Sequence, residues 1–178
     1  GRAKINITST AINTADVPTA LPLKKPVDIK DLQVAVELKG QEARVNNLSF
    51  QLFSGQAKAQ AGMALDPTAP PFNGKVVVQG LQLGPALEAL GSDQVSISGT
   101  AGMDFAMSGR GFSLPDLTKA LEGVGHVAVK DGKIEGVNLI QEALSRLQVV
   151  GLSPDNVKAT AFSTIETDLA IKEGIINV

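Results

Sequence analysis

Apolar and polar residues alternate with a period of two through most of this chain. The pattern is clearest over residues 94–108, where Ile97, Met103, Phe105 and Met107 share one parity and polar or small residues take the other. Side chains of a β-strand point alternately to two faces, whereas a helix repeats every 3.6 residues. The segment therefore predicts one long strand, about 45 Å if it is unbroken at 3.3 Å per residue, with glycines at which it can kink.

Six further segments show the same alternation or a short apolar run, and each is expected to be a strand. They are residues 32–39, 48–52, 57–65, 76–78, 127–129 and 159–171, with a chain reversal at Ile175. Central strands of a parallel sheet are apolar on both faces, whereas antiparallel strands with one solvated face alternate. The pattern therefore favours an antiparallel sheet.

Three short helices are expected between these strands. The first covers residues 83–90, with Pro85 in the first turn and Gly91 directly after the last leucine. The other two begin at Ser113 and Asn138, whose side chains suit the N-cap position. The predicted fold class is α+β: a curved, mainly antiparallel β-sheet with about three short helices packed at its side or ends.

The chain is expected to divide into an irregular N-terminal segment, residues 1–27, and a β-rich domain, residues 28–178. The first segment holds several breakers and only a short strand-like start at residues 3–7. The chain opens on Gly-Arg-Ala-Lys and closes on the strand-like run 174–178. We interpret it as a piece of a longer protein, with any export signal or membrane anchor outside it.

Three glycine-containing motifs are expected to be turns. The Asp131-Gly132 pair is typical of a hairpin turn. The runs 108–112 (Ser-Gly-Arg-Gly-Phe) and 123–125 (Gly-Val-Gly) are glycine-rich, as phosphate-binding loops are. However, neither has the lysine and hydroxyl residue of a P-loop, nor the strand-to-helix setting of a dinucleotide site.

The amino-acid composition excludes several kinds of binding and catalytic site. The chain has 16 basic and 18 acidic residues, so it lacks the cationic excess that nucleic-acid binding needs. It has no Cys, no Trp and no Tyr, which excludes disulfides, thiolate chemistry and most stacking platforms. A single histidine, His126, leaves no second one for a zinc pair. No metal and no cofactor are expected.

Asp104 and His126 are the two side chains that could take part in acid–base chemistry. Asp104 falls on the polar face of the long strand, and His126 alternates with Val127. A catalytic carboxylate needs a partner at a defined separation and a cause for a shifted pKa, and the sequence supplies neither. We interpret both as solvated strand residues and expect no catalytic residues and no enzymatic activity.

Two hypotheses remain for the apolar faces. They are either an ordinary core covered by the helices, or the floor of a groove that receives acyl chains. Methionine suits both, because its flexible thioether fills irregular space. If the groove exists, six residues are expected to contact lipid: Phe50, Leu52, Ile97, Met103, Phe105 and Met107.

The stretch from Val95 to Leu139 resembles a known family. It combines a Val-Ser-Ile-Ser-Gly-Thr-Ala-Gly-Met-Asp-Phe strand, Ser-Gly-Arg-Gly, Leu-x-Gly-x-Gly at 121–125, and Val-Lys-Asp-Gly-Lys-Ile-Glu-Gly-Val-Asn-Leu at 129–139. The runs 52–58 and 161–174 are also similar, so the resemblance covers about residues 28–178. It is to the C-terminal region of the AsmA-like proteins of Gram-negative cell envelopes.

This resemblance implies a protein anchored in the inner membrane, with its bulk in the periplasm. It implies a role in outer-membrane assembly and passage of phospholipid along a β-sheet groove, with phospholipid acyl chains and other envelope proteins as partners. The family has no catalytic residues to carry over. The alternative is a structural or protein-interaction module that caps a larger envelope protein and has no ligand of its own.

Overall fold

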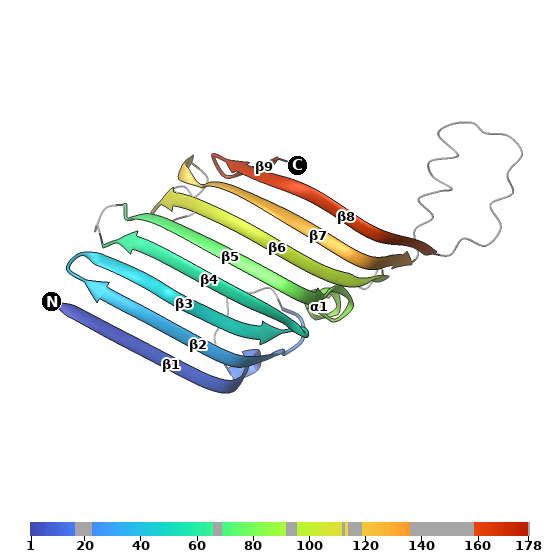
Figure 1. Cartoon of the computed structure of the whole chain (residues 1–178), viewed down its shortest axis with the longest axis horizontal. Helices are drawn as coiled ribbons and strands as arrows, with labels where there is room; N and C mark the ends of the chain where they lie inside the picture. The colour runs from blue at the N-terminus through green and yellow to red at the C-terminus, as the bar shows by residue number, and fades with distance from the viewer. Residues whose placement is uncertain are drawn as a thin grey trace, which may run out of the picture.

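One antiparallel sheet dominates the molecule (Figure 1). The computed structural model describes residues 1–16, 23–65, 69–91, 96–111, 113, 119–135 and 159–177. Nine strands of these residues form the sheet, and their order in space is their order along the chain. The two ends of the chain consequently lie at opposite edges of the sheet (Figure 1).

The strands vary in length from 3 to 15 residues. They are β1 (Arg2–Asn13), β2 (Asp28–Lys39), β3 (Glu42–Leu52), β4 (Gly55–Ala64), β5 (Pro71–Gln82), β6 (Ser96–Arg110), β7 (Glu122–Glu135), β8 (Ala159–Lys172) and β9 (Ile175–Asn177). A 3-10 turn, η1 (Thr14–Asp16), follows β1, and the helix α1 (Leu83–Leu90) follows β5.

The predicted α+β class with three helices is wrong, because the described chain is mainly β. Only α1 is a full helix there. Of the helix expected from Ser113, the described part holds a helical pair at residues 119–120, and Gly123, its expected end, lies in β7. The helix expected from Asn138 lies outside the described residues. Alternation was the stronger signal, and the antiparallel arrangement it predicted is confirmed.

Helix α1 has the bounds that the sequence predicted. Gly91 has φ 76°, a left-handed conformation, and its N–H donates to the carbonyl oxygens of Leu87 and Glu88. Glycine adopts this conformation without steric cost and so ends the helix. The buried residues of α1 are Ala86 and Ala89 rather than the leucines, because the helix packs closely on β6 at the end of the sheet.

The N-terminal segment contributes more to the sheet than the sequence suggested. Strand β1 runs to Asn13, although only residues 3–7 were expected to be extended, and it pairs with β2 along its length. After η1, the amide of Lys24 donates to the carbonyl of Ala89 at 2.8 Å. Residues 23–27 and α1 therefore lie together at the end of the sheet where β1 ends and β2 begins.

The predicted turns at Asp131-Gly132 and at 123–125 are wrong. Both motifs lie inside β7, which continues from Glu122 to Glu135. Asp131 has φ 50° and marks an irregularity in the pairing with β6, where Gly99 has φ 136°. A bulge accommodates such backbone as well as a turn does, and it lets the strand continue.

In the part of the chain that the structure describes, neither face of the sheet is the inside of a compact core. Among the described residues, the buried apolar side chains are Ala57, Ala86, Ala89 and Phe105 only. Most other apolar side chains are half-buried. The sheet is thus a single layer, with α1 and residues 23–27 at one end.

Candidate functional site

The register of the strands gathers the alternating apolar residues of β1 to β8 on one face, which we call the apolar face. One row of paired residues shows this: Leu48 pairs with Ala59, Ala59 with Val76, and Val76 with Phe105. The neighbouring row pairs Val45 with Ala61, Ala61 with Gly74, Gly74 with Met107, and Met107 with Gly123. Directly paired residues share a face, so apolar area runs across the whole width of the sheet.

Small residues in the middle of this face leave a trough along β4. Ala59, Ala61 and Gly74 form its floor, between the larger side chains of β3 on one side and of β6 on the other. A hollow of about 330 Å³ lies here, lined mainly by apolar side chains of β3 to β6. Val45, Met63, Phe72, Val76 and Met107 form its walls. Its volume is at the low end of ligand sites, about 300–1,000 Å³.

Three phenylalanine rings lie flat across glycines of the adjacent strand. A β-carbon added to Gly125 would come within 2.2 Å of the Phe105 ring, and one added to Gly109 within 2.7 Å of the Phe72 ring. Phe162 covers Gly132 in the same way. In all three cases the phenylalanine and the glycine are direct cross-strand partners. Each ring therefore buries apolar area against the neighbouring strand of the same sheet. This packing needs no second layer.

Five of the six residues predicted to contact lipid fall into two groups on different strands. Phe50 and Leu52 lie on β3, opposite Ala57 and Gly55. Met103, Phe105 and Met107 lie on β6, about 14 Å away at the usual spacing between strands.

Ile97 lies at the start of β6, beyond the irregularity at Gly99, and pairs with Ile134. The register thus places the five residues of the two groups on the apolar face, with Ile97 near α1. Phe105 is the one buried member of the set.

Sequence reasoning missed the floor of the trough. The signal was present, because Ala57, Ala59 and Ala61 alternate with polar residues and Gly74 lies two positions before Val76, on the same face of its strand. Small residues say little about contacts until the register shows which larger side chains flank them. The glycines at 123 and 125 were missed for the same reason, since their role depends on the ring of Phe105 one strand away.

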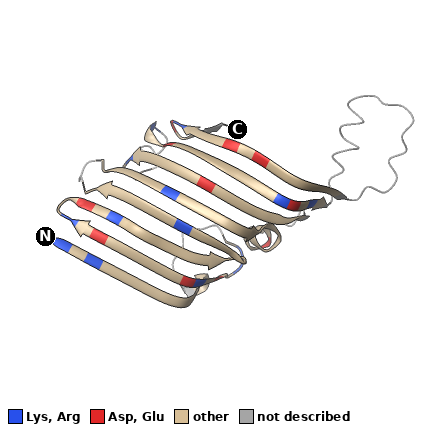
Figure 2. Cartoon of the chain, in the orientation of Figure 1, with Lys and Arg blue, Asp and Glu red and all other residues tan. Residues whose placement is uncertain are grey.

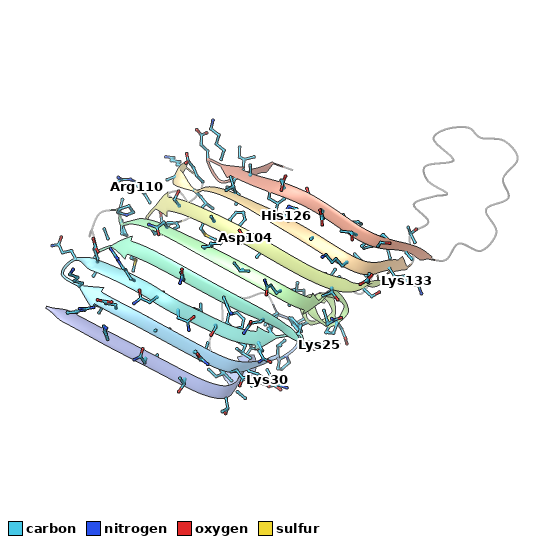
Figure 3. All side chains as sticks on the ribbon, in the orientation of Figure 1. Lys25, Lys30, Asp104, Arg110, His126 and Lys133 are labelled. Carbon is cyan, nitrogen blue, oxygen red and sulfur yellow. The ribbon has the colours of Figure 1, made fainter. Side chains whose placement is uncertain are left out.

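The opposite face carries charged side chains in cross-strand pairs. Asp104 pairs in register with His126, and His126 with Asp168. His126 Nδ1 lies 2.8 Å from Asp168 Oδ1, and Lys75 Nζ lies 3.1 Å from Asp104 Oδ2. The side chains of Asp104 and His126 are 54% and 50% exposed, as expected for solvated strand residues. Figure 3 shows the two on neighbouring strands in the middle of the sheet.

Charged residues do not gather into one patch on the described strands (Figure 2). Two ion pairs nevertheless affect carboxyl groups. A hydrogen bond from Arg2 lowers the pKa of Glu37, and one from Lys25 lowers the pKa of Glu88. Lys25 and Glu88 join residues 23–27 to α1, with Nζ and Oε1 2.5 Å apart. These groups therefore stabilise local structure and do not form a reactive site.

Two features are absent from the described ranges, a metal site and a membrane-spanning helix. There, no three side chains from His, Asp and Glu come together in a way that could hold a metal ion. Nor does any helix of this part of the chain have the length and apolar character needed to cross a membrane.

Comparison of the chain with protein-family models, curated proteins and solved structures found no match.

Proposed function

We propose that this chain is a non-enzymatic domain of an AsmA-like envelope protein, which binds phospholipid acyl chains on its apolar face and passes them along it. The observation that carries the proposal is the trough along β4, whose apolar walls are half-buried rather than covered by a second layer of described residues. Burying a methylene group contributes about 0.8 kcal/mol, so even a partly covered acyl chain is held appreciably.

The trough suits a flexible chain better than a rigid ligand. Its floor of alanine and glycine runs along a strand, and Met63 and Met107 at its sides can change shape to fit different chain positions. The two polar residues at its margin, Gln60 and Asn73, direct their side chains to the opposite face, so it offers little to orient a polar ligand. Head groups would lie outside it, in water at the edge of the sheet.

The cellular setting rests on the resemblance alone. In this proposal the domain lies in the periplasm, the anchor in the inner membrane belongs to another part of the protein, and the protein takes part in outer-membrane assembly. The alternative, a structural or protein-interaction module without a ligand, predicts an apolar face covered by its own chain. In the described residues, α1 and residues 23–27 lie at one end of the sheet only.

A tryptophan placed in the trough tests lipid binding directly, because the chain has no Trp and no Tyr to interfere. In A61W the new ring replaces an exposed side chain of the apolar face, opposite Gly74, which leaves room for it. With vesicles or micelles of phosphatidylcholine carrying brominated acyl chains, the fluorescence of A61W should shift to the blue and be quenched.

The matched control is Q60W, one residue away and on the opposite face. Its emission should stay that of a solvated indole, with little quenching. Equal quenching of both variants would indicate unspecific adsorption, and no quenching of A61W would remove the lipid proposal. Native mass spectrometry of the chain purified from cells should also show masses shifted by bound phospholipid.

A further inference from the structure

The trough along β4 is closed at one end. Gly55, the first residue of β4, lies under the backbone of Leu81, because a β-carbon added to Gly55 would come within 2.7 Å of the Cα and N atoms of Leu81. The cause is a bulge in β5, where Gly80 has φ 71° and the pairing with β6 shifts between Val78 and Leu81. Helix α1 follows directly and stands at this end of the sheet (Figure 1).

The apolar side chains of β4 become more exposed with distance from this closed end. Ala57 is only 9% exposed, because the larger side chains of its cross-strand partners, Phe50 and Val78, flank it. Ala61 is exposed, and Leu65, which follows the strand on the same face, is 42% exposed. Among the described residues, the trough is therefore closed towards α1 and uncovered beyond Ala61.

The closed end suits a methyl group and does not suit a head group. The row that crosses it consists of Phe50, Ala57, Val78 and Met103, which pair in register on the apolar face. None of these side chains can donate a hydrogen bond to a phosphate. Burying an ionised group without a partner is costly, whereas the end of an acyl chain loses nothing there.

We infer that a phospholipid occupies the trough in one orientation, with the methyl end of its acyl chain towards Ala57 and its head group towards Leu65. The inference rests on the proposed function, since it needs an acyl chain in the trough. The distance from Ala57 to Leu65 is about 26 Å at 3.3 Å per residue. That exceeds the roughly 15 Å that one layer of acyl chains occupies in half of a bilayer core.

This orientation adds a direction to the proposed function. The acyl chain enters and leaves past Leu65, or sideways across the strands, and it does not pass α1. Sideways movement from the trough meets Met107, whose flexible side chain separates Gly74 from Gly123 in the same cross-strand row.

Two tryptophan reporters measure the orientation. L65W and A61W each replace an exposed side chain, and the two positions lie about 13 Å apart at 3.3 Å per residue. Each variant is loaded with phosphatidylcholine brominated either near the methyl end or near the carboxyl end of its acyl chains, and unbound lipid is removed by gel filtration. Quenching by the methyl-end bromines, relative to the carboxyl-end bromines, should be stronger in A61W than in L65W.

The opposite ranking would overturn the inferred orientation, and so would equal ratios, because they would show a chain without a fixed direction. In both cases quenching itself would still support lipid binding in the trough. No quenching of either variant by either lipid would instead remove the proposed function, and the inference with it.

A second pair of variants tests the closed end. F50A removes the ring beside Ala57, so the acyl chain should reach further in, and quenching of A61W should shift towards the carboxyl-end bromines. F162A, on β8 and away from the trough, is the matched control and should leave the quenching of A61W unchanged. An unchanged ratio in F50A, with phospholipid still bound by native mass spectrometry, would show that this end does not stop the chain and would overturn the inference.

Discussion

The two faces of the sheet are made by the same strands but stabilise the molecule differently. On the apolar face, the side chains lie against one another within a single layer, as Phe105 does over Gly125. On the polar face, exposed pairs such as His126 with Asp168 span neighbouring strands. Close packing contributes more than solvated ion pairs. Substitutions on the apolar face should therefore affect both stability and binding, and those on the polar face neither strongly.

The largest effect is expected where a ring covers a glycine. In G125A the added β-carbon would lie 2.2 Å from Cδ2 of Phe105 and 2.7 Å from the carbonyl oxygen of Asp104, so the ring must move off the strand. We expect a loss of about 1–3 kcal/mol in the free energy of unfolding, measured by urea denaturation.

The matched control is G62A, a glycine of β4 on the polar face. There the added β-carbon would meet only the side chain of Asn73, at 3.5 Å. It should leave stability unchanged or raise it by about 0.4–1 kcal/mol, because alanine reduces the freedom of the unfolded chain. Equal losses in both variants would mean that the ring contact has no special importance.

The second largest effect is expected when a charged side chain is placed in the wall of the trough. M107D should abolish quenching by brominated phospholipid in the A61W background and cost about 1–2 kcal/mol of stability, since it replaces a half-buried apolar side chain by a carboxylate. S108N, the next residue on the polar face, should change neither. Retained binding in M107D, with the fold intact by circular dichroism, would place the lipid elsewhere.

A smaller effect is expected for the hydrogen-bonded pair of His126 on β7 and Asp168 on β8. H126Q or D168N should change the free energy of unfolding by at most about 1 kcal/mol, because both side chains are at least half exposed. The difference should shrink further in high salt. A larger, salt-independent loss in thermal unfolding would show that this pair does more than span two exposed strands.

The smallest effect is expected at the contact between residues 23–27 and α1. Lys25 lowers the pKa of Glu88, so this contact stabilises the fold above the ordinary pKa of a glutamate. It is lost as the pH falls through the lowered value, when the carboxylate of Glu88 takes up a proton. E88Q should remove this dependence. Amide hydrogen exchange of Lys24, whose N–H binds Ala89 O, should then report equal protection at neutral and acid pH.

The sequence predicted those parts of the fold that depend on local pattern. Alternation located the strands, and the last long strand, expected at residues 159–171, is observed at Ala159–Lys172. Pro85 and Gly91 set the bounds of α1, because proline suits a first turn and glycine the left-handed end.

The predictions that were wrong concern residues whose conformation depends on neighbours distant in sequence. Asp131-Gly132 fits a hairpin turn as well as a bulge, and only the pairing of β7 with β6 on both sides of Gly99 decides between them. In the same way, the turn predicted at Gly123 and Gly125 is wrong because the Phe105 ring, which covers both glycines, belongs to another strand and is not visible in the local sequence. The candidate lipid contacts on β3 and β6 could be named from alternation, but the alanine floor between them needed the register.

Strand order along the sheet matches strand order along the chain, and this affects how the protein unfolds. Each strand is hydrogen-bonded only to those before and after it in sequence, as in a repeat protein, so stability is transmitted from neighbour to neighbour. Such a sheet can form hairpin by hairpin with few distant contacts, and it can peel from an edge without first losing its centre. Amides in β5 and β6 should therefore exchange last and those of β1 first, in a gradient across the sheet.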